Sequence, residues 1–165
     1  MKAQFEMMAA YNAWANRRLY AAAARLDEED YRADLGAFFC SVHGTLNHLI
    51  VGDMIWMARF RGDPSADLKL DDIIYHSHEE LRVARLELDE EIVLYFTALP
   101  ASDLEREFTY TPITLPDPVT QSRAPAMAHF FNHQTHHRGQ VHALLTRLTG
   151  EAPPLDLLYY LREVD

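Results

Sequence analysis

Three histidines, at positions 48, 133 and 137, are the residues of this 165-residue chain whose types and spacing best suit a chemical site. His133 and His137 lie four residues apart in the segment HFFNHQTHHRGQVH, which spans 129–142. Residues four apart on a helix have Cβ atoms roughly 5 to 6 Å apart, so two imidazoles can bind one metal ion at about 2.0 to 2.1 Å. The pair therefore predicts part of a metal site.

Helical periodicity separates this pair from the other three histidines of the same segment. At about 100° per residue, His137 falls on the centre line of the apolar stripe and His133 within about 40° of it. His129 lies near the edge of the stripe, and His136 and His142 point away from it. An inward pair is also consistent with core histidines that have hydrogen-bond partners, because an unsatisfied buried group costs about 1 to 3 kcal/mol. The pair alone leaves both interpretations open.

His48 is the third candidate ligand and lies in a different predicted helix. Its neighbours four residues before and after it are Gly44 and Gly52, so no side chain lies above or below it on that face. Each glycine inside a helix costs about 1 kcal/mol relative to alanine, which implies a reason in packing or function. By itself the pattern favours close helix packing, with His48 bonded to a backbone carbonyl. Together with the inward-facing pair His133 and His137, the pattern favours a metal site. The space left by the two glycines would then admit a facing helix or a ligand beside the metal.

Three histidines leave at least one coordination position for water or substrate, which is typical of a catalytic rather than a closed structural site. A divalent ion there could polarise a carbonyl or lower the pKa of bound water or thiol. Imidazole ligands fit Zn or Ni, and also Fe, Co or Cu, with Mn as a further candidate, so the sequence does not select the metal. Asn132, Gln134, Arg138 and Gln140 are candidates for hydrogen bonds to the ligands, or are simply helix surface.

Other residues give weaker signals. The sequence contains no His-Glu-x-x-His or Glu-x-x-His pair and no glycine-rich phosphate loop. Cys40 is expected to be a small buried residue, the alternative being a thiol activated by the helix start that follows it. His76 and His78 are expected to face solvent. Asp53 lies about 140° around its helix from His48, which favours a hydrogen-bonding or surface role over that of a general base.

The elements that must position these residues are helices, and we expect an all-α fold, an antiparallel four-helix bundle that forms one domain over residues 1–165. The predicted helices span about 3–26, 41–61, 78–99 and 122 or 125 to 149. A proline-rich segment, 107–121, predicts at most a short irregular hairpin over one bundle end before the fourth helix. The segment LDLLYYLRE predicts a final short helix. Tyr11, Trp14 and Arg18 lie on a second side of the first helix, which we expect to be a partner surface.

Composition and charge limit the possible partners. Acidic residues outnumber basic ones by 25 to 15, so the net charge of -10 argues against nucleic acid. No apolar run approaches the roughly 20 residues of a membrane span, and the first residues lack a signal peptide, so we expect a cytoplasmic protein. The single cysteine excludes an internal disulfide.

Four segments together resemble the DinB family, the DNA-damage-inducible group of the DinB/YfiT-like metalloenzyme superfamily. They are YNAWANRRLY, HGTLNHLIVGD, HFFNHQTHHRGQVHALLTRL and PPLDLLYYL, and the NHxxxHRG pattern at 132–139 is the most specific part. The resemblance implies a metal triad at His48, His133 and His137, a four-helix bundle that is often a homodimer, and bound nickel or zinc. It further implies relatives that are thiol S-transferases or thiol-dependent isomerases using bacillithiol, mycothiol or glutathione.

Three functions follow as hypotheses. The first is a metal-dependent enzyme, a thiol-dependent S-transferase or a hydrolase, that acts on a small electrophile with or without a low-molecular-weight thiol. The second is a non-catalytic metal-binding module of a stress response. The third is a dimeric bundle with a histidine-rich core that binds no ion.

Overall fold

Helices make up most of the computed structural model, which describes residues 1–64, 67–113 and 115–164. The only strands in these residues form one small sheet. The elements are α1 (Lys2–Ala23), α2 (Glu28–Arg32), α3 (Val42–Arg61), α4 (His78–Ala98), the 3₁₀ helix η1 (Ala101–Glu105), β1 (Glu107–Tyr110), β2 (Val119–Ser122), α5 (Arg123–Thr149) and α6 (Leu157–Val164). The predicted helices are confirmed to within three residues at each end, and α2 is an additional short helix.

Local capping signals mark both ends of α3, the start of α4 and the end of α5. The Ser41 hydroxyl caps α3, and Ser77 forms a capping box with Glu80 at the start of α4. Such caps contribute roughly 1 kcal/mol each. Gly62 and Gly150 follow α3 and α5 with φ of 76° and 79°, a left-handed conformation in which glycine meets no steric penalty. Both ends of α3, which carries His48, and the end of α5, which carries His133 and His137, are therefore set by the local sequence.

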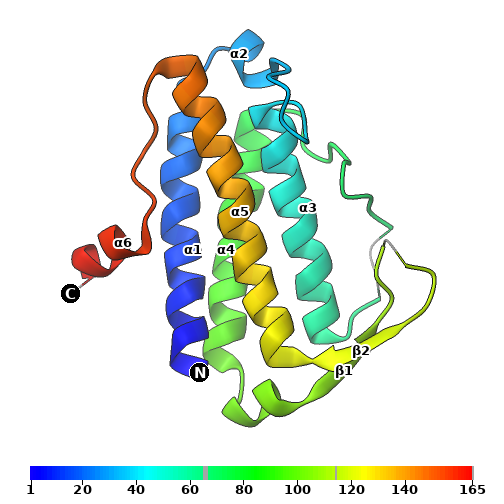
Figure 1. Ribbon diagram of the computed structural model, residues 1–165. Helices are drawn as coiled ribbons and strands as arrows, with labels where there is room; N and C mark the ends of the chain where they lie inside the picture. Colours follow the sequence, from blue (N-terminus) through cyan, green and yellow to red (C-terminus); the bar gives the residue numbers. More distant parts are fainter. Residues whose placement is uncertain (65–66, 114, 165) are drawn as a thin grey trace.

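The four long helices pack side by side, but not all neighbours run antiparallel (Figure 1). Helix α1 contacts α4 and α5, and α3 contacts the same two helices. Near the start of α3, His43 bonds the Tyr75 carbonyl just before α4, while near its end the Phe60 carbonyl accepts from the hydroxyl of Tyr95 late in α4. Helices α3 and α4 are thus parallel, and the prediction that all neighbours alternate in direction is wrong. The chain returns to the starting end of α3 before α4 begins.

A buried polar network crosses the core between α1, α3 and α4. Arg85 Nη1 donates to Asp53 at 2.6 Å, and Arg85 Nη2 lies 2.9 Å from Asp89 Oδ1. Asn12 and Asn16 donate to the same Asp89 carboxylate. Because Asp53 is fully buried in this network, its predicted hydrogen-bonding role is confirmed and a surface role is excluded.

The predicted hairpin forms at the end of the helices where α3 finishes and α5 starts (Figure 1). Strands β1 and β2 are antiparallel, with Glu107 opposite Ser122 and Tyr110 opposite Val119. This register brings the aromatic side chain of Tyr110 against Trp56 of α3, with ring centroids 5.4 Å apart. The hairpin therefore packs against the last turns of α3.

The second side of α1 is covered by the chain's own C-terminal segment. The Tyr11 hydroxyl donates to the Leu155 carbonyl at 2.6 Å, and Trp14 Nε1 donates to Glu163 at 2.7 Å. The expectation that these aromatic residues form a partner surface is wrong, because α6 and the residues before it bury both. None of the helices in the described ranges combines the length and apolarity that a bilayer span requires.

Candidate metal centre

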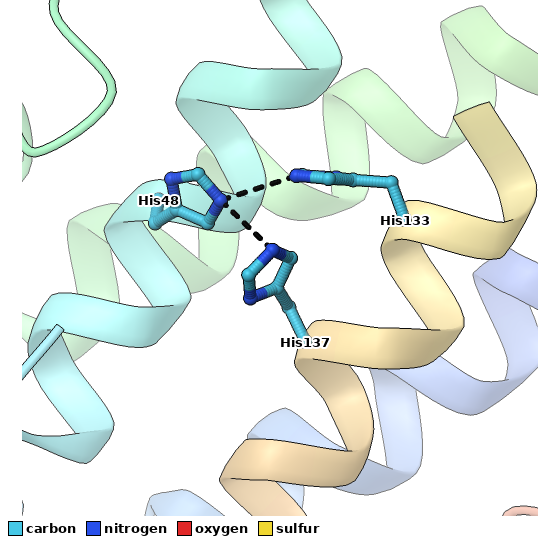
Figure 2. A group of neighbouring side chains, drawn as sticks. All are labelled: His48, His133 and His137. Atoms are coloured by element: carbon cyan, nitrogen blue, oxygen red, sulfur yellow. Dashed lines mark hydrogen bonds between the residues drawn. The ribbon is translucent and has the colours of Figure 1, made fainter. Parts of the chain in front are cut away.

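Helices α3 and α5 bring the three predicted ligands to one place (Figure 2). The Nε2 atom of His48 lies 3.2 Å from that of His133 and 3.1 Å from that of His137. His48 and His137 are buried, with 3% and 8% of their surface exposed, and His133 is half-buried. Three imidazole nitrogens, from two different helices, thus point at a common position.

Hydrogen bonds at the far side of two rings determine which nitrogen carries the proton. His48 Nδ1 lies 2.7 Å from the Leu70 carbonyl, and His137 Nδ1 lies 2.7 Å from Oε1 of Gln140. Both oxygens only accept, so each Nδ1 is the donor and each Nε2 carries a lone pair. Two lone pairs 3.1 Å apart cannot bond to each other. A cation between them turns this repulsion into coordination, so the donor set fits a metal ion.

The nitrogen separations also fit a single ion. Two nitrogens bound at about 2.0 to 2.1 Å lie about 2.9 Å apart when they subtend a right angle and about 3.3 to 3.4 Å apart at a tetrahedral angle. The observed 3.1 and 3.2 Å fall between these limits. The three histidines are therefore close enough to hold one divalent ion, and their geometry leaves the identity of the metal open.

Burial keeps the three imidazoles neutral, which is the form that binds a metal. Burial, together with the neighbouring His137 and His48, lowers the pKa of His133 to about 3. Burial likewise lowers the pKa of His137 to about 4, against the opposing effect of the bond to Gln140. The pKa of His48 is lowered by burial and partly restored by its bond to the Leu70 carbonyl.

The two glycines that flank His48 are explained by close approaches. A Cβ on Gly52 would lie 3.0 Å from Cε1 of His133, so this glycine makes room for a ligand from the facing helix. A Cβ on Gly44 would lie 2.2 Å from the backbone oxygen of Phe39. The predicted gap around His48 is thus confirmed on both sides. It admits α5 on one side and the chain before α3 on the other.

Comparison with known proteins gives the family context. The model of the DinB family matches residues 1–164. The chain belongs to the DinB family. Protein DinB of Bacillus subtilis (strain 168) is 25% identical to this DinB-family chain over 161 residues, which cover 92% of the chain and 90% of that protein. The relationship predicted from four sequence segments is therefore confirmed over almost the whole length.

Two contacts of this DinB-family site were missed in the sequence. The Phe39 ring stacks on His48 with centroids 3.8 Å apart and presents an edge to His137 at 5.6 Å. The Leu70 carbonyl orients His48, as described above. Both residues lie outside the helices, where periodicity gives no information. The aromatic pair Phe38-Phe39, which Cys40 separates from the Ser41 cap, was the one available signal.

The candidates for hydrogen bonds to the ligands divide into three groups. Gln140 bonds His137 as expected. Gln134 and Arg138 are buried on another side of α5, where an Arg138 guanidinium nitrogen donates to Asn12. Asn132 is exposed. Only Gln140 of the four therefore supports a triad residue directly.

Three further expectations were tested by the structure, and two are wrong. Cys40 is exposed, because it adopts a left-handed φ of 63° in the turn before α3 and turns away from the core. His78 is half-buried rather than solvated, since its Nε2 bonds the Tyr20 carbonyl at 3.1 Å across to α1. His76 is exposed as expected.

A cavity of about 280 Å³ adjoins the site through His133. It lies between α3, the start of α5 and the hairpin. The lining residues are Gly52, Ile55, Trp56, Arg59, Leu70, Tyr110, Pro112, Ile113, His129 and His133. Pockets for drug-sized ligands measure roughly 300 to 1,000 Å³, so this slightly smaller cavity suits a smaller molecule.

Proposed function

We propose that this DinB-family protein is a metal-dependent enzyme in which His48, His133 and His137 hold one divalent ion, nickel or zinc. A small electrophile reacts with a low-molecular-weight thiol, or with water, at a coordination position that the protein leaves free. The observation that carries this proposal is the convergence of imidazole lone pairs beside a cavity of substrate size. A closed structural site would have a fourth protein ligand.

The chain's own residues prepare the site for this chemistry. Leu70 and Gln140 hold the rings of His48 and His137 so that each Nε2 faces the same point. Phe39 covers one face of His48 and limits the access of water from that side. A bound divalent ion supplies Lewis acidity, which polarises a carbonyl or lowers the pKa of a thiol or water.

The quaternary arrangement belongs to the same proposal. We take the four long helices to be the four-helix bundle of the DinB/YfiT-like superfamily, assembled as a homodimer. Family membership supports both points. The size of the cavity supports a small molecule as the substrate.

The test uses protein purified without an affinity tag. Metal analysis is compared between the wild type and the His133→Ala and His137→Ala variants, with His136→Ala as a control because this exposed neighbour lies outside the triad. Turnover is then measured with thiols and an aryl halide electrophile, and separately with esters. We expect metal-dependent turnover that both triad variants lose and His136→Ala keeps.

Two outcomes would contradict the proposal in different ways. Tight metal binding without turnover in either panel would favour a non-catalytic metal-binding module. Chelation then distinguishes the roles, because removal of a structural ion lowers the unfolding temperature strongly, whereas removal of a catalytic ion abolishes activity first. No metal binding at all would leave a helical protein with an empty histidine-rich core.

A further inference from the structure

Arg59, near the end of α3, has an unusual environment in the cavity beside the metal centre. Its guanidinium carbon lies 4.7 Å from the ring centre of Trp56 and 4.5 Å from that of Tyr110. Two aromatic faces therefore hold the guanidinium, one from the same helix and one from the hairpin. Such contacts orient an arginine but do not neutralise its charge.

Arg59 has no carboxylate partner within the described ranges. The ion pairs there involve other basic residues, such as Arg61, which pairs with Glu91 only two positions further along α3. Arg59 Nε is buried with no hydrogen-bond partner, and Nη2 reaches only the Thr111 carbonyl at 3.5 Å. The protein has 25 acidic and 15 basic residues, so carboxylates are abundant in the chain as a whole and yet Arg59 pairs with none in the described ranges.

The position of Arg59 connects this charge to the proposed chemistry. Arg59 and His133 line the same cavity of about 280 Å³. A small molecule in it can therefore contact the guanidinium while its other end lies beside a triad histidine. Arginine binds a carboxylate through two parallel hydrogen bonds, and its planar group remains charged at neutral pH even when half-buried.

We infer that the thiol used by this enzyme carries a carboxylate, and that Arg59 binds that carboxylate while the sulfur lies at the metal centre. The inference rests on the proposed function and adds a chemical class of substrate and a residue that determines specificity. Trp56 and Tyr110 hold Arg59 in position, and the exposed His129 ring, 5.2 Å from Trp56, lines another part of the same cavity.

The test compares two thiols that differ only at the carboxyl group, 3-mercaptopropionate and its methyl ester. Each is titrated into protein loaded with Co²⁺ in place of the native ion, and the thiolate-to-metal charge-transfer band reports binding of sulfur. We expect the wild type to bind the free acid at least about tenfold more tightly than the ester, a difference of about 1.4 kcal/mol.

Two arginine variants separate a specific contact from a general effect of charge. Arg59→Met is expected to remove the preference for the acid and to leave the affinity for the ester unchanged. Arg61→Met makes the same change in net charge outside the cavity and should keep the preference. Arg59→Lys retains the charge but not the two-pronged geometry, so it should reduce the preference for the acid over the ester at least about threefold. This variant takes the place of Arg59→Met if Arg59→Met fails to fold.

The outcomes distinguish this inference from the proposed function. A band with both thiols at equal affinity in the wild type would overturn the inference and leave the metal-dependent function intact. A preference that survives in Arg59→Met would also overturn it, because the carboxylate would then bind elsewhere, for example to the metal itself. Absence of a band with either thiol would contradict the thiol-dependent function, and the inference with it.

Discussion

Replacement of Gly52 by alanine tests whether the contact between α3 and His133 sets the geometry of the metal centre. The new Cβ would lie 3.0 Å from Cε1 of His133, whereas ordinary contacts begin near 3.4 Å, so the ring must move by about 0.4 Å. Metal–ligand distances tolerate only about 0.2 Å. We expect Gly52→Ala to weaken Zn²⁺ binding about tenfold or more, which is about 1.4 kcal/mol.

The same substitution should not destabilise the metal-free fold. Alanine favours a helix by about 1 kcal/mol over glycine, and without an ion the His133 ring is free to move toward the adjoining cavity. Gly139→Ala is the matched control, because Gly139 lies in α5 and nothing stands within 4 Å of its added Cβ. Both variants should therefore unfold at urea concentrations at or above that of the wild type when a chelator is present.

The assay is a competition titration against a chromophoric chelator, with urea unfolding of each metal-free protein alongside. Gly139→Ala should bind Zn²⁺ with wild-type affinity and Gly52→Ala should not. Equal affinities for the two variants would refute the reasoning, because His133 would then bind the ion in an orientation that ignores α3, or not at all.

Three further predictions concern the ligand support, pH and the buried network. Gln140→Leu removes the acceptor of His137 Nδ1 and should weaken Zn²⁺ binding about tenfold, whereas Gln140→Glu should not; equal loss in both would contradict an orienting role. Burial lowers the pKa of His133 to about 3, below the value near 6.5 expected for the unfolded chain, so the unfolded chain binds protons first as the pH falls. The stability from neutral His133 is therefore full above about pH 6.5 and is lost as the pH falls toward 3. At pH 5, urea unfolding of the metal-free protein should show a loss on the order of 2 kcal/mol relative to neutral pH, and His133→Gln should show a smaller loss. An equal loss in His133→Gln would contradict this prediction. Arg85→Met leaves Asp53 and Asp89 buried without their cation and should destabilise the protein by about 3 to 5 kcal/mol, an expectation that an unchanged urea midpoint would contradict.

The periodicity of α5 identified His133 and His137 as an inward-facing pair, and His48 was added from the two glycines that flank it and from the family resemblance. An imidazole on the centre of an apolar stripe must face another helix, which made His133 and His137 a pair and set them apart from His136. The two glycines around His48 then indicated a close approach. These inferences depend on which face of a helix a residue occupies, and sequence spacing determines that directly.

The sequence was less informative wherever a loop determines the outcome. The return of the chain before α4 makes α3 and α4 parallel, and no local signal records that direction. Phe39 and Leu70 contact His48 from segments without periodicity. Trp14 was placed on a partner surface because the docking of α6 depends on the path of the chain after Gly150, which helix patterns do not describe.

X-ray absorption on tag-free protein loaded with one equivalent of Zn²⁺ tests the central claim most directly. If His48, His133 and His137 bind the ion together, the spectrum will show three imidazole nitrogens at about 2.0 to 2.1 Å and at least one further donor, such as a water oxygen, that does not belong to an imidazole. Fewer than three imidazoles, or a shell that contains sulfur from Cys40, would contradict the account.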